Sequence, residues 1–235
     1  MIIRRNLRLV PGTTIAPIDL HSAEAFPLQT AQIGLANLPV ADPGQTGGGL
    51  ITGGGSIPLS AGINSGAIVP FAALPSAKLA PGDLYVVNHY SSSAAGTVDV
   101  TSYFRSPNGQ QLTIPAIPSG AQVWNTGEPG DVRLTAEWPM TEPGSAHFAD
   151  YAQGSDLPNM RWWHLTVSPS HATTEVGPIT VPDLRGMAGW NSLWDLAVGV
   201  ATTWSVGSRS STSVGASPRG GTIETSTAQQ ETITP

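Results

Sequence analysis

Residues 96–138 read GTVDVTSYFRSPNGQQLTIPAIPSGAQVWNTGEPGDVRLTAEW, and the fold prediction starts from this stretch. Apolar and polar residues alternate in three runs within it, 98–104, 111–116 and 132–138. An alternation of period two is typical of β-strands that bury one face. Pro107–Gly109 fits a three-residue loop, which places Phe104 opposite Leu112 and keeps the apolar sides together. The stretch therefore predicts an antiparallel β-core that includes a hairpin.

Further strands are predicted on both sides of this core, at 3–10, 15–20, 30–35, 67–74, 82–90, 146–151, 161–168 and 176–181. One helix is predicted at 184–201, because apolar residues there recur at roughly helical spacing and Asp183 is a suitable N-cap. The fold class predicted is all-β: an antiparallel β-sandwich, jelly-roll or immunoglobulin-like, with one C-terminal helix and long Gly/Ser/Thr-rich arms.

The domain division follows from the same patterns. Residues 1–182 form the β-sandwich domain, with a Gly-rich loop at 44–66 that contains two Gly-Gly-Gly runs. Residues 183–204 form a helix packed on the sandwich or on a neighbour. Residues 205–235 form an extended Ser/Thr/Gly-rich tail, a composition typical of disorder in isolation. If the protein is a subunit that assembles through this tail, deleting 208–235 is expected to leave a folded domain that no longer assembles.

The composition is poor in charge. Charged residues make up 11% of the chain, against about 25% in typical domains, so either uncharged polar residues or other subunits must cover the surface. The net charge of −6 makes nucleic acid an unlikely partner, although Arg4, Arg5 and Arg8 form a local basic cluster. The chain has no cysteine, its first residues do not resemble a signal peptide, and no apolar run could span a membrane.

Motifs for catalysis and cofactor binding are absent from the sequence. It contains no GxSxG, no HExxH and no phosphate-binding loop, so we expect no enzyme, no cofactor and no metal. Serine is so abundant that many Ser–His–Asp sets could be assembled, which gives no single set any weight. The acidic residues around 137–156 are interpreted as solvated side chains.

Tryptophans are the strongest candidates for an interaction surface. Trp162 and Trp163 are adjacent in a predicted strand and must point to opposite faces, so one is expected in the core and the other exposed or covered by a loop or partner. With Trp124 and Trp138 they could form a sugar-binding platform. Trp190 and Trp194 could pack on the sheet, on a neighbouring subunit or at a membrane surface. The predicted interaction surface comprises Trp162, Trp190, Trp194, Arg4, Arg5 and Arg8.

The run GTVDVTSYFRSPNGQQLTIPAIPSGAQVW, the low charge and the Gly/Ser/Thr-rich arms resemble bacteriophage virion proteins of the β-sandwich or single jelly-roll type. The resemblance implies a structural virion subunit, a coat or capsid-associated protein that is made in the host cytoplasm. Its partners would be copies of itself and other virion proteins, with a membrane surface or a glycan as a further contact. The alternative is a receptor- or carbohydrate-binding module, such as a phage tail or spike protein.

Overall fold

The computed structural model describes residues 1–3, 11, 21–38, 44–63, 66–139, 145–154, 160–169, 178–213 and 218–235. Within these ranges the chain is all-β, as the sequence predicts. Its helical segments are three short 3-10 turns, η1 (Ser22–Glu24), η2 (Ser76–Lys78) and η3 (Ser192–Trp194). Among the residues described, no helix has the length and apolar character needed to cross a membrane.

The strands form three sheets, and in chain order they are β1 (Gln29–Ala36), β2 (Gln45–Thr52), β3 (Gly55–Ile63), β4 (Ile68–Ala73), β5 (Leu84–Ser93), β6 (Gly96–Phe104), β7 (Gln111–Thr113), β8 (Gln122–Asn125), β9 (Leu134–Glu137), β10 (Ala146–Gln153), β11 (Arg161–Val167), β12 (Ile179–Thr180), β13 (Thr202–Ser211) and β14 (Ile223–Ile233).

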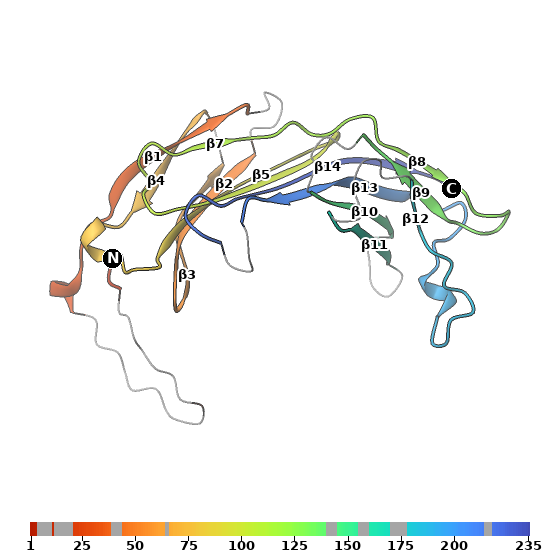
Figure 1. The fold of residues 1–235 in the computed structure, drawn as a ribbon, viewed down its shortest axis with the longest axis horizontal. Helices are drawn as coiled ribbons and strands as arrows, with labels where there is room; N and C mark the ends of the chain where they lie inside the picture. Colours follow the sequence, from red (N-terminus) through yellow and green to blue (C-terminus); the bar gives the residue numbers. More distant parts are fainter. Residues whose placement is uncertain are drawn as a thin grey trace.

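The largest sheet has eight strands in the order β11-β10-β13-β14-β6-β5-β2-β3, and all neighbours in it are antiparallel. Two three-stranded sheets accompany it, β4-β1-β7 and β12-β9-β8. The molecule is an elongated arch (Figure 1). The sheet β4-β1-β7 lies at the end that carries the N-terminus, and β12-β9-β8 lies at the other end with the C-terminus.

Both hydrophobic cores lie on one face of the eight-stranded sheet. Residues that lie opposite each other on neighbouring strands point to the same face of a sheet. Val98 lies opposite Thr227, Thr227 opposite Ser208, and Ser208 opposite His147, so these four side chains share one face. Val98 belongs to the first core, and Ala149, two residues beyond His147 on the same face, belongs to the second. One long sheet therefore supports a separate small sheet at each end.

Each core is built around buried aromatic rings. In the first, between β4-β1-β7 and strands β2, β5 and β6, the rings of Phe71, Tyr85 and Phe104 lie 5.7–6.0 Å apart and are at most 4% exposed. In the second, Tyr151 and Trp204 pack with residues of β9. All four apolar residues of the predicted alternation at 132–138 are buried in this second core, but Thr135, which was predicted to face out, is buried as well.

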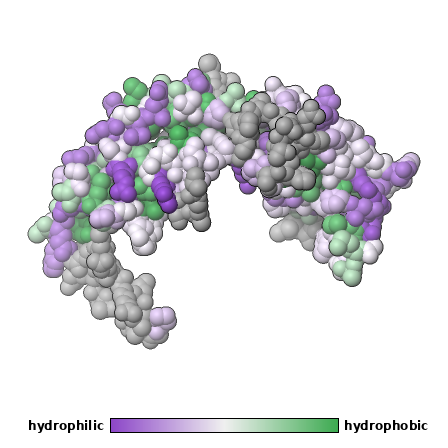
Figure 2. All heavy atoms as spheres, viewed as in Figure 1, coloured by the Kyte–Doolittle hydropathy of each residue, from purple (hydrophilic) through white to green (hydrophobic). Residues whose placement is uncertain are grey.

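The opposite face of the long sheet carries polar side chains that bond to one another. Asn88 donates to Asp99 over 2.8 Å and to Thr101 over 2.9 Å, and Tyr103 donates to Glu224 over 3.1 Å. On this face the carboxylates of Asp99 and Glu224 thus accept hydrogen bonds from uncharged donors. In Figure 2 apolar residues gather at the tip of the arch that carries η3.

The hairpin predicted across Pro107–Gly109 is wrong in its pairing. β6 pairs with β5, where Tyr85 lies opposite Phe104, and with β14 on its other side. β7 pairs in parallel with β1, where Leu112 lies opposite Leu35. Phe104 and Leu112 nevertheless share the first core. The period-two pattern identified the buried faces, but local spacing does not specify which strand becomes the neighbour.

The predicted strands that fall in the described residues are present as β1, β4, β5, β10 and β11, and short strands β9 and β12 occur within two further predictions. The prediction for 15–20 and nearly all of that for 3–10 fall outside the described residues.

The prediction of a Gly-rich loop at 44–66 is wrong, because β2 and β3 form a hairpin there within the long sheet. A Cβ at Gly48 would overlap the ring of Phe71, and a Cβ at Gly49 would lie 2.7 Å from the carbonyl oxygen of Ile57. Glycine in this strand therefore allows close packing against the core and the neighbouring strand.

The prediction of an extended tail at 205–235 is also wrong. β13 and β14 are central strands of the long sheet, and Val206 and Ala228 are only 1% and 2% exposed. β14 pairs with β13 and with β6, so it joins the two halves of the sheet. Deleting 208–235 would remove this connection, and the expectation that a folded domain would survive the deletion is withdrawn.

The predicted helix at 184–201 does not form. Gly186 and Gly189 have φ values of 97° and 86°, which a right-handed helix cannot accommodate. The segment consists of turns and the single 3-10 turn η3. The apolar spacing at 184–201 instead places tryptophans along an irregular segment that packs against β11.

Candidate functional site

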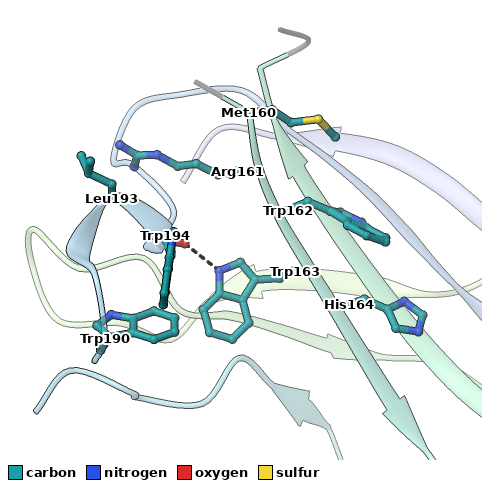
Figure 3. Close-up of a pocket in the computed structure, with 8 residues that line it drawn as sticks. All are labelled: Met160, Arg161, Trp162, Trp163, His164, Trp190, Leu193 and Trp194. Atoms are coloured by element: carbon teal, nitrogen blue, oxygen red, sulfur yellow. Dashed lines mark hydrogen bonds between the residues drawn. The ribbon is translucent and has the colours of Figure 1, made fainter. Parts of the chain in front are cut away.

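An open pocket of about 470 Å³ lies where β11 meets the η3 segment, at the edge of the long sheet (Figure 3). Its wall is mainly aromatic and apolar, formed by Met160, Arg161, Trp162, Trp163, His164, Trp190, Leu193 and Trp194. The volume falls within the range of about 300–1,000 Å³ that is usual for small-ligand sites.

The two adjacent tryptophans of β11 point to opposite faces, as predicted. Trp162 is 62% exposed, whereas Trp163 packs against the second core. The Trp163 indole donates to the carbonyl oxygen of Trp194 over 2.9 Å. The ring of Trp190 lies 5.5 Å from that of Trp163 and 5.1 Å from that of Trp194, the latter pair being edge to face. Trp163 and Trp190 therefore support Trp194, which is 52% exposed.

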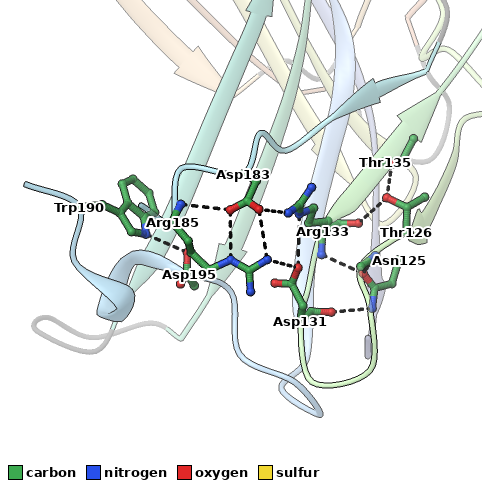
Figure 4. A network of polar contacts seen from close by, with 10 residues as sticks. Asn125, Thr126, Asp131, Arg133, Thr135, Asp183, Arg185, Trp190 and Asp195 are labelled. Carbon is green, nitrogen blue, oxygen red and sulfur yellow. Dashed lines mark hydrogen bonds and ion pairs between the residues drawn. The ribbon is translucent and has the colours of Figure 1, made fainter. Parts of the chain in front are cut away.

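Ion pairs hold the start of the segment that carries Trp190 and Trp194 (Figure 4). Asp183 pairs with Arg133 at the edge of β9 and with Arg185, whose Nε lies 3.1 Å away. Arg185 also reaches Asp131 over 2.7 Å. Hydrogen bonds from Arg185 lower the pKa of Asp183, and the same contact raises the pKa of Arg185. These groups are exposed, so their effect depends on pH and salt.

A buried glutamine holds the end of the same segment. The Gln153 amide donates to the carbonyl oxygens of Ala197 and Val200 over 2.9 and 3.3 Å and accepts from the Ala197 N–H over 2.7 Å. Asp195 is fixed as well, because its carbonyl accepts from Arg161 over 2.6 Å and its carboxylate accepts from the Trp190 indole over 3.2 Å. The pocket wall is therefore anchored on both sides.

His164 forms the outer rim of the pocket and is held rigidly. Its Nδ1 lies 2.6 Å from Asp150, and its Nε2 lies 2.8 Å from the Thr166 hydroxyl. The imidazole stands between the rings of Phe148, at 6.3 Å, and Trp162, at 5.9 Å. A carboxylate, an imidazole and a hydroxyl occur in the same order in acyl-transfer catalysts. Here Asp150 lies on β10, whereas His164 and Thr166 lie on β11, and we infer that the two hydrogen bonds orient the His164 ring beside Trp162.

The structure brings three of the predicted interaction residues together, since Trp162, Trp190 and Trp194 all line the pocket. Arg4, Arg5 and Arg8 lie outside the described residues. Of the predicted sugar platform, Trp163 joins Trp162, but the other two members lie elsewhere: Trp138 is buried in the second core and Trp124 is on β8.

Sequence reasoning missed Met160, Arg161, His164 and Leu193 as site residues. The alternation in RWWH could have placed His164 on the same strand face as Trp162. Nothing local could have shown that the η3 segment packs beside this strand, because that contact depends on tertiary structure.

In the ranges that the structure describes, no group of three or more His, Cys, Asp or Glu side chains is placed to hold a metal ion. No protein-family model matches the chain, and no curated protein matches its sequence. The functional argument therefore starts from the chemistry of the pocket.

Proposed function

We propose that the protein is a non-catalytic recognition module that binds a sugar ring in the tryptophan pocket. The observation that carries the proposal is the pair of exposed indoles, Trp162 and Trp194, on a rigidly supported pocket of about 470 Å³. The face of an aromatic ring is negative, so it attracts the slightly positive C–H groups of a sugar. A sugar ring also needs hydrogen-bond donors and acceptors around its edge.

Polar groups at the pocket could provide these bonds. Among the described residues, the indole N–H groups of Trp162 and Trp194 have no acceptor, and Arg161 uses one of its nitrogens. By contrast, the indole N–H groups of Trp163 and Trp190 are engaged within the protein. Donors are therefore available on the exposed tryptophans, while the supporting tryptophans are satisfied internally.

Isothermal titration with a panel of oligosaccharides tests the proposal. Replacing Trp162 or Trp194 with alanine should weaken binding of the best ligand at least roughly tenfold, as expected for a central aromatic contact. Tyr90→Ala is the matched control, because Tyr90 is 44% exposed on β5, away from the pocket. Full binding by both tryptophan variants, or an equal loss in the tyrosine variant, would refute the assignment.

A second candidate is the structural virion subunit, a coat or capsid-associated protein. It is favoured by the low proportion of charged residues, 11%, which suits the burial of surface against other subunits. We infer that the layered sheets are a sandwich-type scaffold for either role. The tail cannot serve as an assembly arm, since 205–235 supplies central strands. Light scattering over a concentration series tests this role: a large assembly would support it, and a stable monomer would exclude self-assembly.

A further inference from the structure

The tryptophan pocket has an uneven distribution of charge. Arg161 is the only permanently charged residue among the described residues that line it, and none of the residues lining it is acidic. The protein as a whole has a net charge of −6, which repels anions. A positive side chain at an aromatic pocket of an acidic protein points to selection of the ligand by charge.

The charge of Arg161 is not neutralised by an ion pair among the described residues. Its guanidinium donates to the neutral backbone carbonyl of Asp195 over 2.6 Å, which fixes the side chain and leaves further N–H groups. The carboxylate of Asp195 accepts from the Trp190 indole, and Asp195 lines a neighbouring hollow rather than the pocket itself. In Figure 3 the Arg161 side chain extends away from Trp162, toward the segment that carries Leu193 and Trp194.

The acidic group that contacts His164 of the pocket is also occupied. Asp150 is bound to His164 on the outer face of the sheet and does not line the pocket. Arg133 and Arg185, by comparison, both form ion pairs with aspartates. Arg161 thus differs from these two arginines in facing a ligand site with its charge available.

We infer that the sugar bound in the pocket carries a carboxylate, as uronic and sialic acids do, and that Arg161 recognises it. This inference rests on the proposed function. The planar guanidinium presents paired N–H donors that match the two oxygens of a carboxylate. The apolar face of the same sugar would stack on Trp162 or Trp194, so that one ring satisfies both the aromatic and the charged part of the pocket.

The test uses matched probes that differ only in charge. Tetra-galacturonate, tetra-mannuronate and sialyllactose are each titrated beside their methyl esters at low and high salt. At least one acid should bind roughly tenfold or more tightly than its ester, and added salt should reduce the difference. Arg161→Gln should remove the preference for the acid while ester binding persists. Arg161→Lys, which can still donate to the Asp195 carbonyl, should keep part of it.

Each outcome has a separate meaning. Equal binding of acid and ester in every pair would overturn the inference and leave the proposed function standing. No binding by any acid or ester, while a neutral oligosaccharide of the panel binds, would overturn the inference alone, and no binding of any oligosaccharide would overturn both. A sulfated tetrasaccharide that binds more tightly than the carboxylated ones would overturn the assignment to carboxylate. Unchanged tryptophan fluorescence in the Arg161 variants is required, since it shows that the pocket wall is intact.

Discussion

Replacing Gly207 with alanine tests whether the Ser/Thr/Gly-rich C-terminal segment is the centre of the sheet. Gly207 lies in β13 opposite Ala228 of β14, and a Cβ there would overlap the carbonyl oxygen of Thr227 and approach the Ala228 Cα to 2.7 Å. Because both neighbours are backbone atoms, the two strands must move apart. Overpacking of this kind costs about 1–3 kcal/mol. For a chain of this length, that corresponds to a fall in Tm of roughly 2–12 °C.

The assay is urea denaturation followed by tryptophan fluorescence. Gly53→Ala is the control, since Gly53 lies in the β2–β3 turn with no atom near the position of a Cβ and should change the free energy of unfolding by less than about 0.5 kcal/mol. If 205–235 were a disordered tail, Gly207→Ala would behave like this control. Equal midpoints for the two variants would therefore refute the placement of β13 and β14.

Further predictions concern the second core and the pocket. Trp204→Ala should cost about 3–5 kcal/mol, because Trp204 is 3% exposed, whereas Trp162→Ala should leave the unfolding midpoint nearly unchanged. Tyr151→Phe should not destabilise the protein in the same denaturation assay, since its buried hydroxyl has no hydrogen-bond partner among the described residues. The folded-state pKa of Asp183 is lowered, so its contribution is present at neutral pH and is lost as pH falls below the ordinary aspartate value of about 3.9. Acid should then lower the protection of the Trp190 backbone amide in the wild type, measured as its exchange rate relative to the intrinsic rate at each pH, and Asp183→Asn should show the lower protection already at pH 7.

Sequence patterns predicted the all-β class and most strand positions, because alternation reports which side of a strand is buried. Phe104 and Leu112 were both predicted to be buried, and both lie in the first core, but they belong to different sheets rather than to one hairpin. Strand order depends on long-range pairing and has no local signal. The same limit explains why Trp162, Trp190 and Trp194 were each predicted as interaction residues, while their meeting in one pocket was not.

The errors in the C-terminal third have a different cause. Serine, threonine and glycine in β13 and β14 suggest disorder by composition. Val206 of β13 and Ala228 of β14 are nevertheless buried, and the two strands pair along their length. Apolar spacing from 184 onward suggested a helix, whereas left-handed glycines such as Gly186 break it. In both cases the local pattern was present in the sequence, but contacts between segments distant in the chain determined the structure that forms.

The most direct test of the tryptophan pocket uses the indole N–H signals in a ¹⁵N–¹H spectrum, since the chain has seven tryptophans. Single substitutions assign the signals, and the carboxylated oligosaccharides are then titrated in. The account predicts that the Trp162 and Trp194 signals shift while those of the buried Trp138 and Trp204 stay in place. Shifts confined to other tryptophans, or no shift with any oligosaccharide, would contradict it.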